Sequence, residues 1–432
     1  MRDTTAVRFP TFVNRWLAPP VPLTVGQRTL LKGLAIVAVV VGYQGSLTSA
    51  SLTFAAEQWG ATSADQSRSL AFIRADIVLA LLLVRAADRV GRRRMLLICA
   101  GFGPVGTAFC ALTTGIVQFT VIQIVARAFV TAAAILIAVL GVESLPAEAR
   151  AWASGALVIA AAAGSATTLF ALPLADATPS AWRALYLIPL LSLLGLPMIA
   201  RRITESERFE RNVAQRREQL ASLRSSLRSH GRRLAALGLF LFLLAFQGTP
   251  SRQLQNDFLR RERGFSALAI AVFGIATNAP GLIGLIVGGR LADRLGRKRV
   301  ITVALVAFAI GDAGLYLTRG PLQWAFSVFG ALIGGASLPA LGIYAAELFP
   351  TAIRSTTNGL TTAMSRVGGV CGLLFVGAIS RVDHVGPAVA VTTAALWLGV
   401  LVLHALIPET AGRELEELNP EDAPRQASSP PW

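Results

Sequence analysis

The sequence predicts an all-α membrane protein with twelve membrane-spanning helices, arranged as two related bundles of six. Three observations predict this class. The 432 residues are 54% hydrophobic and only 15% charged, whereas soluble domains carry about 25% charged residues. The apolar residues gather in runs long enough to cross a bilayer, which takes about 20 residues in a helix. The second half of the chain also repeats motifs of the first half at a nearly constant spacing.

Twelve apolar runs define the expected spans, and we interpret them as helices because an open strand would leave its backbone groups unpaired in lipid. The first six runs cover 31–56, 69–87, 95–114, 116–142, 152–173 and 182–200. The second six cover 235–258, 266–289, 300–318, 322–346, 356–380 and 386–407. The expected organisation is a cytoplasmic segment 1–30, a first bundle 31–200, a cytoplasmic loop 201–233, a second bundle 234–408 and a cytoplasmic tail 409–432.

The basic residues predict the orientation in the membrane. With both termini in the cytoplasm, 29 of the 40 Lys and Arg residues fall in cytoplasmic segments and 8 fall on the outer side. This excess follows the positive-inside rule, so we expect a multi-pass protein of the cell membrane with both termini cytoplasmic. It also explains the net charge of +16 without a nucleic-acid partner. The loop 201–233 is basic with apolar residues at helical spacing, and the tail is acidic.

Two motifs occur once in each half. The first, R-x-x-D-R-x-G-R, follows the second span at 85–92 and the eighth span at 290–297, an offset of 205 residues. The second, E-x-x-P-x-x-x-R, follows the fourth span at 143–150 and the tenth at 347–354, an offset of 204 residues. Ordinary basic loops would explain the arginines but not the matched Asp, Gly, Glu and Pro positions. The pattern therefore indicates an internal duplication.

These motifs and the two sets of six spans resemble the major facilitator superfamily, and within it the sugar-porter and metabolite–proton symporter branch. The segments 344–354 and 408–417 resemble signatures of that branch. The resemblance covers 31–418 and implies a monomeric secondary carrier for a small-molecule solute, coupled to protons, in which two bundles rock around a central cavity. Nothing in the sequence shows the proton coupling directly.

The resemblance also implies two cytoplasmic charge clusters and two intramembrane arginines. The first cluster would contain Asp88, Arg89, Glu143 and Arg150. The second would contain Asp293, Arg294, Glu347 and Arg354. Arg127 in the fourth span and Arg366 in the eleventh fit the intramembrane positions. The clusters either latch the two halves together when the cavity faces outward or act only in topology and folding.

The seventh span is the most polar and is the expected lining of a solute pocket. Gln247, Ser251 and Gln255 recur at i, i+4 and i+8 and so lie on one helix stripe, with Arg252 and Asn256 on the adjacent stripe. Pro250 favours a break in this helix. The alternative is that the chain from Arg252 onward already lies outside the membrane. In the first span, Gln44 is a further candidate for hydrogen bonding to a solute.

The second span carries Arg74 and Asp76, and a charge inside a span is a functional hypothesis by default. Asp76 is the first candidate for proton coupling, with Arg74 beside it. The alternative for Asp76 is a structural ion pair with a basic residue across the seam between the halves. Asp312 in the ninth span is a weaker candidate, because that span is peripheral in the family. We interpret the G-x-x-x-G pattern at 368–372 as helix packing.

The sequence therefore predicts a secondary carrier for a small polar organic solute, either a carboxylate or a sugar-like metabolite. It has no G-x-S-x-G, H-E-x-x-H or P-loop motif, and its three Cys and three His show no ligand spacing. We therefore expect neither enzyme activity nor a cofactor or metal. Two alternatives stay open, which are an exporter of drugs or metabolites within the same class and a membrane sensor or scaffold that does not transport.

Overall fold

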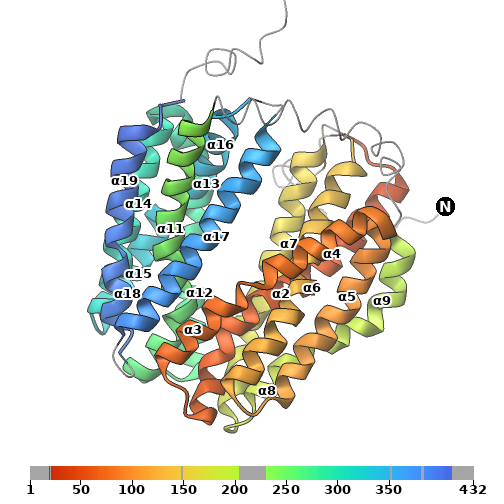
Figure 1. Ribbon diagram of the computed structural model, residues 1–432, viewed down its shortest axis with the longest axis horizontal. Coiled ribbons are helices and arrows are strands. Elements are labelled where there is room, and N and C mark those ends of the chain that lie inside the picture. Colours follow the sequence, from red (N-terminus) through yellow and green to blue (C-terminus); the bar gives the residue numbers. More distant parts are fainter. Residues whose placement is uncertain are drawn as a thin grey trace, which may run out of the picture.

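A computed structural model describes residues 19, 21–146, 149–203, 230–350, 353–380 and 384–410. Its elements are helices, and Figure 1 shows them as two bundles that lie side by side and lean together at one end. The first bundle is built from α2 to α9 and the second from α11 to α19. Parts of the expected N-terminal segment 1–30 (1–18 and 20), of the expected loop 201–233 (204–229) and of the expected tail 409–432 (411–432) lie outside the described residues.

The first bundle contains the first six expected spans. Its helices are α2 (Val25–Trp59), α3 (Ser63–Ile73), α4 (Asp76–Val90), α5 (Arg92–Phe109), α6 (Ile116–Glu143), α7 (Arg150–Ala171), α8 (Trp182–Leu187) and α9 (Leu191–Arg202). Short 3₁₀ turns extend or join these helices at Cys110–Leu112, Leu172–Asp176 and Ile188–Leu190. The buried side chains of this half form a core of their own around Leu34, Leu96 and Leu140.

The second bundle repeats this plan. Its helices are α11 (Gly231–Asp257), α12 (Ala267–Asn278), α13 (Gly281–Leu295), α14 (Arg297–Leu317), α15 (Pro321–Gly334), α16 (Ser337–Glu347), α17 (Arg354–Ile379), α18 (Gly386–Thr392) and α19 (Ala394–Leu406), with a π-helical turn η6 (Phe258–Glu262) after α11. The break expected at Pro250 is wrong, because α11 runs through it without interruption. Proline has no backbone N–H, and neighbouring groups in a packed bundle can supply a hydrogen bond to the carbonyl that is left without a donor.

Eleven helical segments of the described chain are long and apolar enough to cross a membrane, and one of them, Ala267–Leu295, contains both α12 and α13. The remaining expected span is the second, which is divided into α3 and α4 by the turn at Arg74 and Ala75. The eighth span is divided at the corresponding place, Ala279 and Pro280, 205 residues later. Both copies of the duplicated unit therefore bend their second span at the same depth, although only the second copy has a proline there to explain the break.

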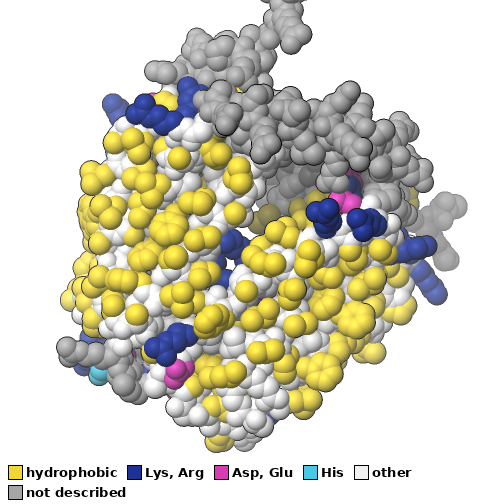
Figure 2. Space-filling view, viewed as in Figure 1, with side chains coloured by type: hydrophobic (Ala, Val, Ile, Leu, Met, Phe, Trp, Pro, Cys, Tyr) yellow, Lys and Arg dark blue, Asp and Glu magenta, His cyan; other side chains and the backbone are white. Residues whose placement is uncertain are grey.

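The outer surface of both bundles is apolar, as lipid contact requires. Large hydrophobic side chains such as Val121, Leu194, Ile286 and Leu401 are more than half exposed. In Figure 2 hydrophobic side chains cover the sides of both bundles, while Lys and Arg gather near the helix ends and in the hollow between the bundles. The fold therefore presents its apolar surface to lipid and keeps charge at the two ends and along the seam.

Close glycine contacts join the first and fifth span of each half. An added Cβ on Gly164 of α7 would collide with the Val39 carbonyl of α2. In the second half, an added Cβ on Gly368 or Gly372 of α17 would collide with the backbone of α11 at Phe242 or Phe246. This confirms that the 368–372 pattern packs helices, since the missing side chains let two backbones approach.

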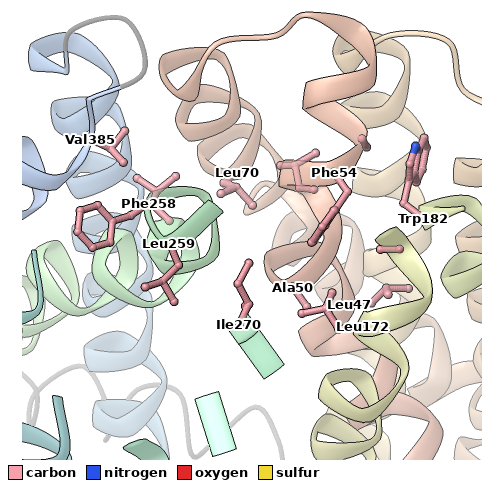
Figure 3. Packing of buried hydrophobic residues seen from close by; sticks show 14 of the residues in the cluster. Leu47, Ala50, Phe54, Leu70, Leu172, Trp182, Phe258, Leu259, Ile270 and Val385 are labelled. Carbon is pink, nitrogen blue, oxygen red and sulfur yellow. The ribbon is translucent and has the colours of Figure 1, made fainter. Parts of the chain in front are cut away.

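The two bundles meet through an apolar layer at the end shown lower in Figure 1. Leu47, Phe54 and Leu70 of the first half pack in one buried cluster with Phe258 and Leu259 of the second half. Figure 3 shows these side chains facing one another across the seam. We call this cluster the outer seal. It removes apolar surface of both halves from water and so favours contact between the bundles at this end.

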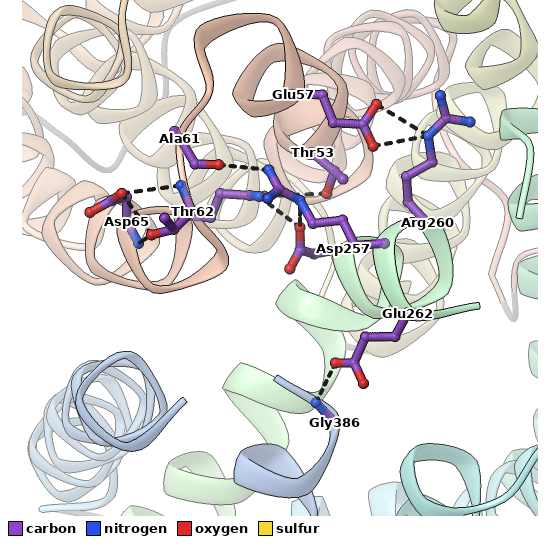
Figure 4. A network of polar contacts seen from close by, with 11 residues as sticks. Thr53, Glu57, Ala61, Thr62, Asp65, Asp257, Arg260, Glu262 and Gly386 are labelled. Carbon is purple, nitrogen blue, oxygen red and sulfur yellow. Dashed lines mark hydrogen bonds and ion pairs between the residues drawn. The ribbon is translucent and has the colours of Figure 1, made fainter. Parts of the chain in front are cut away.

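Polar contacts reinforce the outer seal (Figure 4). Arg260 of η6 pairs with Glu57 of α2 at 3.1 Å and with Asp176 at 3.0 Å. Asp257 of α11 accepts a hydrogen bond of 2.6 Å from Gln66 of α3 and pairs with Arg261 at 3.0 Å. The contacts of Arg260 with Glu57 and Asp176 and of Gln66 with Asp257 cross between the halves, so they close the seam at this end of the molecule.

The glycine contacts yield a test of the packing. We expect Gly164→Ala to lower the free energy of unfolding by about 1–3 kcal/mol, because the added methyl group must push α7 away from α2. Gly155→Ala on the same helix is the matched control, since an added Cβ there meets no atom within 4 Å. Thermal unfolding in detergent measures both. A Gly164→Ala variant as stable as the Gly155→Ala variant would contradict the close approach.

Candidate functional site

Two adjoining cavities lie between the bundles at the depth of the broken second span. The larger has a volume of about 600 Å³ and is lined mainly by helices of the second half, with Arg74 reaching in from the first. The smaller has a volume of about 310 Å³ and lies on the seam, lined by residues of both halves that include Arg127. Arg74 and Arg366 line both cavities. We call the two together the central cavity, and Figure 2 shows basic side chains in this hollow.

Asp76 is the buried carboxylate of the first half that contacts the arginines of the central cavity. Its side chain is 1% exposed and accepts a hydrogen bond of 2.6 Å from Thr131. Arg127 of α6 lies 3.8 Å from one carboxylate oxygen and Arg366 of α17 lies 3.7 Å from the other. Asp76 therefore binds one arginine from each half, which is the arrangement that the alternative interpretation of this residue expected.

Arg74 lies at the end of α3 and points across the seam. Its guanidinium donates a hydrogen bond of 3.3 Å to Thr249 of α11. An added Cβ on Gly369 of α17 would stand 3.0 Å from the Arg74 Nη1. The missing side chain of Gly369 thus leaves space for the Arg74 guanidinium. The turn at Arg74 places this positive charge in the central cavity.

Asp312 of α14 is the site residue that the sequence interpretation undervalued. It is 6% exposed and lines the larger cavity. Gln247 donates to one of its oxygens at 2.5 Å and Ser251 to the other at 2.6 Å. The Gln247–Ser251 stripe of α11 therefore faces a carboxylate of the same half. The signal available in the sequence was the charge itself, since a carboxylate within a span needs such partners.

Of the other candidates in the first and seventh spans, two line the central cavity and two do not. Arg252 and Gln255 line the larger cavity beside Gln247 and Ser251, so this part of α11 lies at cavity depth and not outside. Asn256 instead donates to the Ala50 carbonyl at 3.1 Å in the seam. Gln44 is 3% exposed and lies inside the first bundle, where Thr107 donates to it at 2.8 Å. Neither Asn256 nor Gln44 lines the central cavity.

The duplicated motifs form one ion cluster in each half. Arg92 contacts both Asp88, at 3.7 Å, and Glu143. Arg297 contacts Asp293 at 3.7 Å and Glu347 at 2.6 Å. Six crossings separate the Asp88 turn from the Asp293 turn, so the two turns lie at the same face of the molecule. That face is opposite to the outer seal.

The arginine assigned to each of these clusters has to be corrected. Arg92 and Arg297 hold the carboxylates, whereas Arg89 and Arg294 are exposed. Gly91 and Gly296, both at positive φ, turn the chain between two helices, so that Arg92 and Arg297 begin the next helix beside the carboxylates. Arg150 donates to the Leu145 carbonyl at 3.2 Å, and the side chain of Arg354 lies outside what the structure describes. Arg127 and Arg366 belong to the central cavity.

Two six-span bundles with a charged cavity between them are the architecture of a membrane transporter. A family model described as Major Facilitator Superfamily matches residues 34–278 and 254–432. The chain belongs to this superfamily, as its motifs implied. It is therefore a multi-pass membrane transporter and not an enzyme.

Named relatives and solved structures agree with this assignment. "Putative niacin/nicotinamide transporter NiaP" of Bacillus subtilis (strain 168) is 25% identical over 76% of this chain and 83% of its own length. The cis,cis-muconate transport protein of Acinetobacter baylyi is 30% identical over 46% of this chain and 48% of its own. The crystal structure of a D-xylose–proton symporter matches 89% of this chain and 99% of its own with a TM-score of 0.74 at 18% identity. That last likeness shows the fold.

The corrected clusters lead to a prediction. Arg297→Gln removes a charged partner of both Asp293 and Glu347, and we expect it to slow transport at least about tenfold, because Glu347 loses a charged hydrogen-bond donor worth about 1.5–3 kcal/mol. Arg294→Gln, three residues earlier and exposed, should leave transport unchanged. Initial uptake rates in proteoliposomes compare the two variants. Equal rates would show that the ion cluster has no part in transport.

Proposed function

We propose that this transporter carries a small organic carboxylate through the central cavity by alternating access. One observation carries the proposal: guanidinium groups from both halves line a single cavity at membrane depth, with Arg74 from the first half and Arg252 and Arg366 from the second. Guanidinium matches a carboxylate with two parallel hydrogen bonds, which gives affinity and orientation together. Neutral sugars offer no charge to these groups, so we favour a carboxylate over a sugar-like solute.

The names of two relatives support this class of solute. One is named for niacin and nicotinamide and the other for cis,cis-muconate. Niacin and muconate are both unsaturated carboxylates. The large cavity is also lined by Leu244, Phe308 and Leu338 among its apolar residues, which suits a flat carbon skeleton attached to a charged group.

The proposed transport cycle starts from the state seen here. If the basic motif face is cytoplasmic, as the positive-inside rule indicates, the outer seal closes the external end and both termini are cytoplasmic. The protein is then in an inward-facing state. To face outward, the bundles must part at Arg260 and Asp257 and approach one another near the Arg92 and Arg297 clusters. Those clusters would then serve as the latch of the outward-facing state.

Proton coupling is assigned to Asp76 in this proposal. The carboxylate contacts Arg127 of its own half and Arg366 of the other. Protonation would remove the charge that attracts both guanidiniums and so strengthen the attraction of the central cavity for a solute carboxylate. Proton binding and solute binding would thereby support each other across the seam.

The carboxylate class can be tested with matched pairs that differ only in charge. We expect millimolar nicotinate and succinate to raise the midpoint of thermal unfolding of the purified protein, because a ligand that binds the folded state stabilises it. Their amides, nicotinamide and succinamide, should cause little shift, since they carry no charge for Arg252 or Arg366. Shifts by amides or neutral sugars that match those by the acids would refute the proposed class.

A second test addresses coupling. Asp76→Asn keeps the shape and the Thr131 contact but cannot exchange a proton, so we expect proton-driven accumulation in proteoliposomes to be lost while solute exchange across the membrane persists. Asp65→Asn is the control, because Asp65 caps α3 outside the central cavity and is partly exposed. Accumulation by the Asp76→Asn variant at the wild-type level would assign coupling to another group.

A further inference from the structure

The charges of the central cavity do not balance. Four guanidinium groups line it, from Arg74, Arg127, Arg252 and Arg366. Two buried carboxylates accompany them: Asp312 lines the larger cavity, and Asp76 contacts Arg127 and Arg366. With all six groups ionised, the cavity carries two more positive charges than negative ones. Uncompensated charge at membrane depth is costly, so this excess needs a partner that the protein does not supply.

Two of the four guanidiniums, those of Arg74 and Arg252, have no carboxylate within 4 Å among the described residues. Asp76 is shared by Arg127 and Arg366. Asp312 accepts hydrogen bonds from Gln247 and Ser251 and has no arginine within 4 Å in the described part of the chain. Arg74 reaches only the neutral Thr249 hydroxyl, and its Nε has no acceptor among the described residues. Arg252 is exposed to the cavity and makes neither an ion pair nor a side-chain hydrogen bond with any described residue.

These two groups belong to different halves of the transporter. Arg74 ends α3 in the first bundle and Arg252 lies on α11 in the second, yet both line the 600 Å³ cavity. A ligand with one anionic group can neutralise only one of them by direct contact. A ligand with an anionic group at each end can neutralise both and can bind the two halves to each other.

We propose that the preferred solute is a dicarboxylate, held with one carboxylate against Arg74 and the other against Arg252. This inference rests on the proposed carboxylate function and narrows it. The two carboxylates restore charge balance in the cavity, and each forms its own bidentate contact. Because the two contacts lie on opposite sides of the seam, a bound dicarboxylate links the halves that have to move together during transport.

The experiment compares two ligands that share a six-carbon diene chain, trans,trans-muconate with two carboxylates and sorbate with one. Affinities are measured by calorimetric titration of the purified full-length protein in detergent. We expect muconate to bind at least about tenfold tighter than sorbate, since a hydrogen-bonded charge contact contributes about that factor or more. Saturated dicarboxylates from malonate to adipate then show which separation of the carboxylates fits best.

Variants locate the two contacts. Arg74→Gln and Arg252→Gln should each weaken muconate roughly tenfold or more, and the double variant should bind muconate no better than sorbate. Arg89 is exposed in the motif at 85–92 and lines neither cavity, so Arg89→Gln is the matched control and should leave both affinities unchanged. Thermal unfolding of each variant verifies its fold. Where a glutamine variant unfolds, Arg74→Lys or Arg252→Lys replaces it, with a smaller loss expected because lysine keeps the charge without the fork.

Gly369 gives an independent check on Arg74. Gly369→Ala places a methyl group where the Arg74 guanidinium and Thr249 now lie, so it should weaken muconate while changing sorbate little if sorbate binds at Arg252. Gly359→Ala on the same helix, where an added Cβ meets no atom within 4 Å, should have no effect.

Three outcomes would overturn the inference. Equal affinities for muconate and sorbate would show a single anionic contact and leave the carboxylate function standing. Competition by inorganic phosphate as effective as that by muconate would show one doubly charged head group in place of two separated carboxylates. Failure of every carboxylate to bind a protein that unfolds at its normal temperature would remove the proposed function together with this inference.

Discussion

Charge at membrane depth is the constraint on which the arrangement of this protein depends. A buried carboxylate in a bilayer needs partners, and Asp76 obtains them from Thr131, Arg127 and Arg366, so three helices of two bundles have to stay in register around it. Asp312 obtains its partners within one half. Asp312 lines the larger cavity, and the arginines without a carboxylate contact give the central cavity a positive potential that attracts anions.

The two ends of the molecule are built on different principles. At the outer seal, apolar side chains and ion pairs cross from one half to the other, as Phe258 and Arg260 show. At the motif face, Arg92 and Arg297 each close a cluster within a single half. Cross-seam contacts oppose separation of the bundles, whereas contacts within a half keep each bundle rigid. Rigid halves that are joined at one end favour rocking over bending.

The spans, the duplication and the superfamily could be predicted from sequence because each leaves a local or repeated pattern. The site was predicted only in part. Spacing along α11 correctly grouped Gln247 with Ser251, but it could not show that both face Asp312, 61 and 65 residues away. Family position alone placed Asp312 at the periphery. The choice of Arg89 over Arg92 followed motif resemblance, which could not show that the turn at Gly91 brings Arg92 back to the carboxylates.

The departures from internal symmetry locate the function. Both halves bend their second span at corresponding residues, and Gly164 and Gly368 occupy corresponding places 204 residues apart. At the same offsets, Arg74 and Asp76 correspond to Ala279 and Gly281 in the other copy, and Arg366 corresponds to Ala162. Duplication alone would have conserved either the charge or its absence in both halves. The scaffold is therefore symmetric where helices pack and asymmetric in the charged residues of the central cavity, which is why the proposed solute and proton sites lie in residues that the repeat does not share.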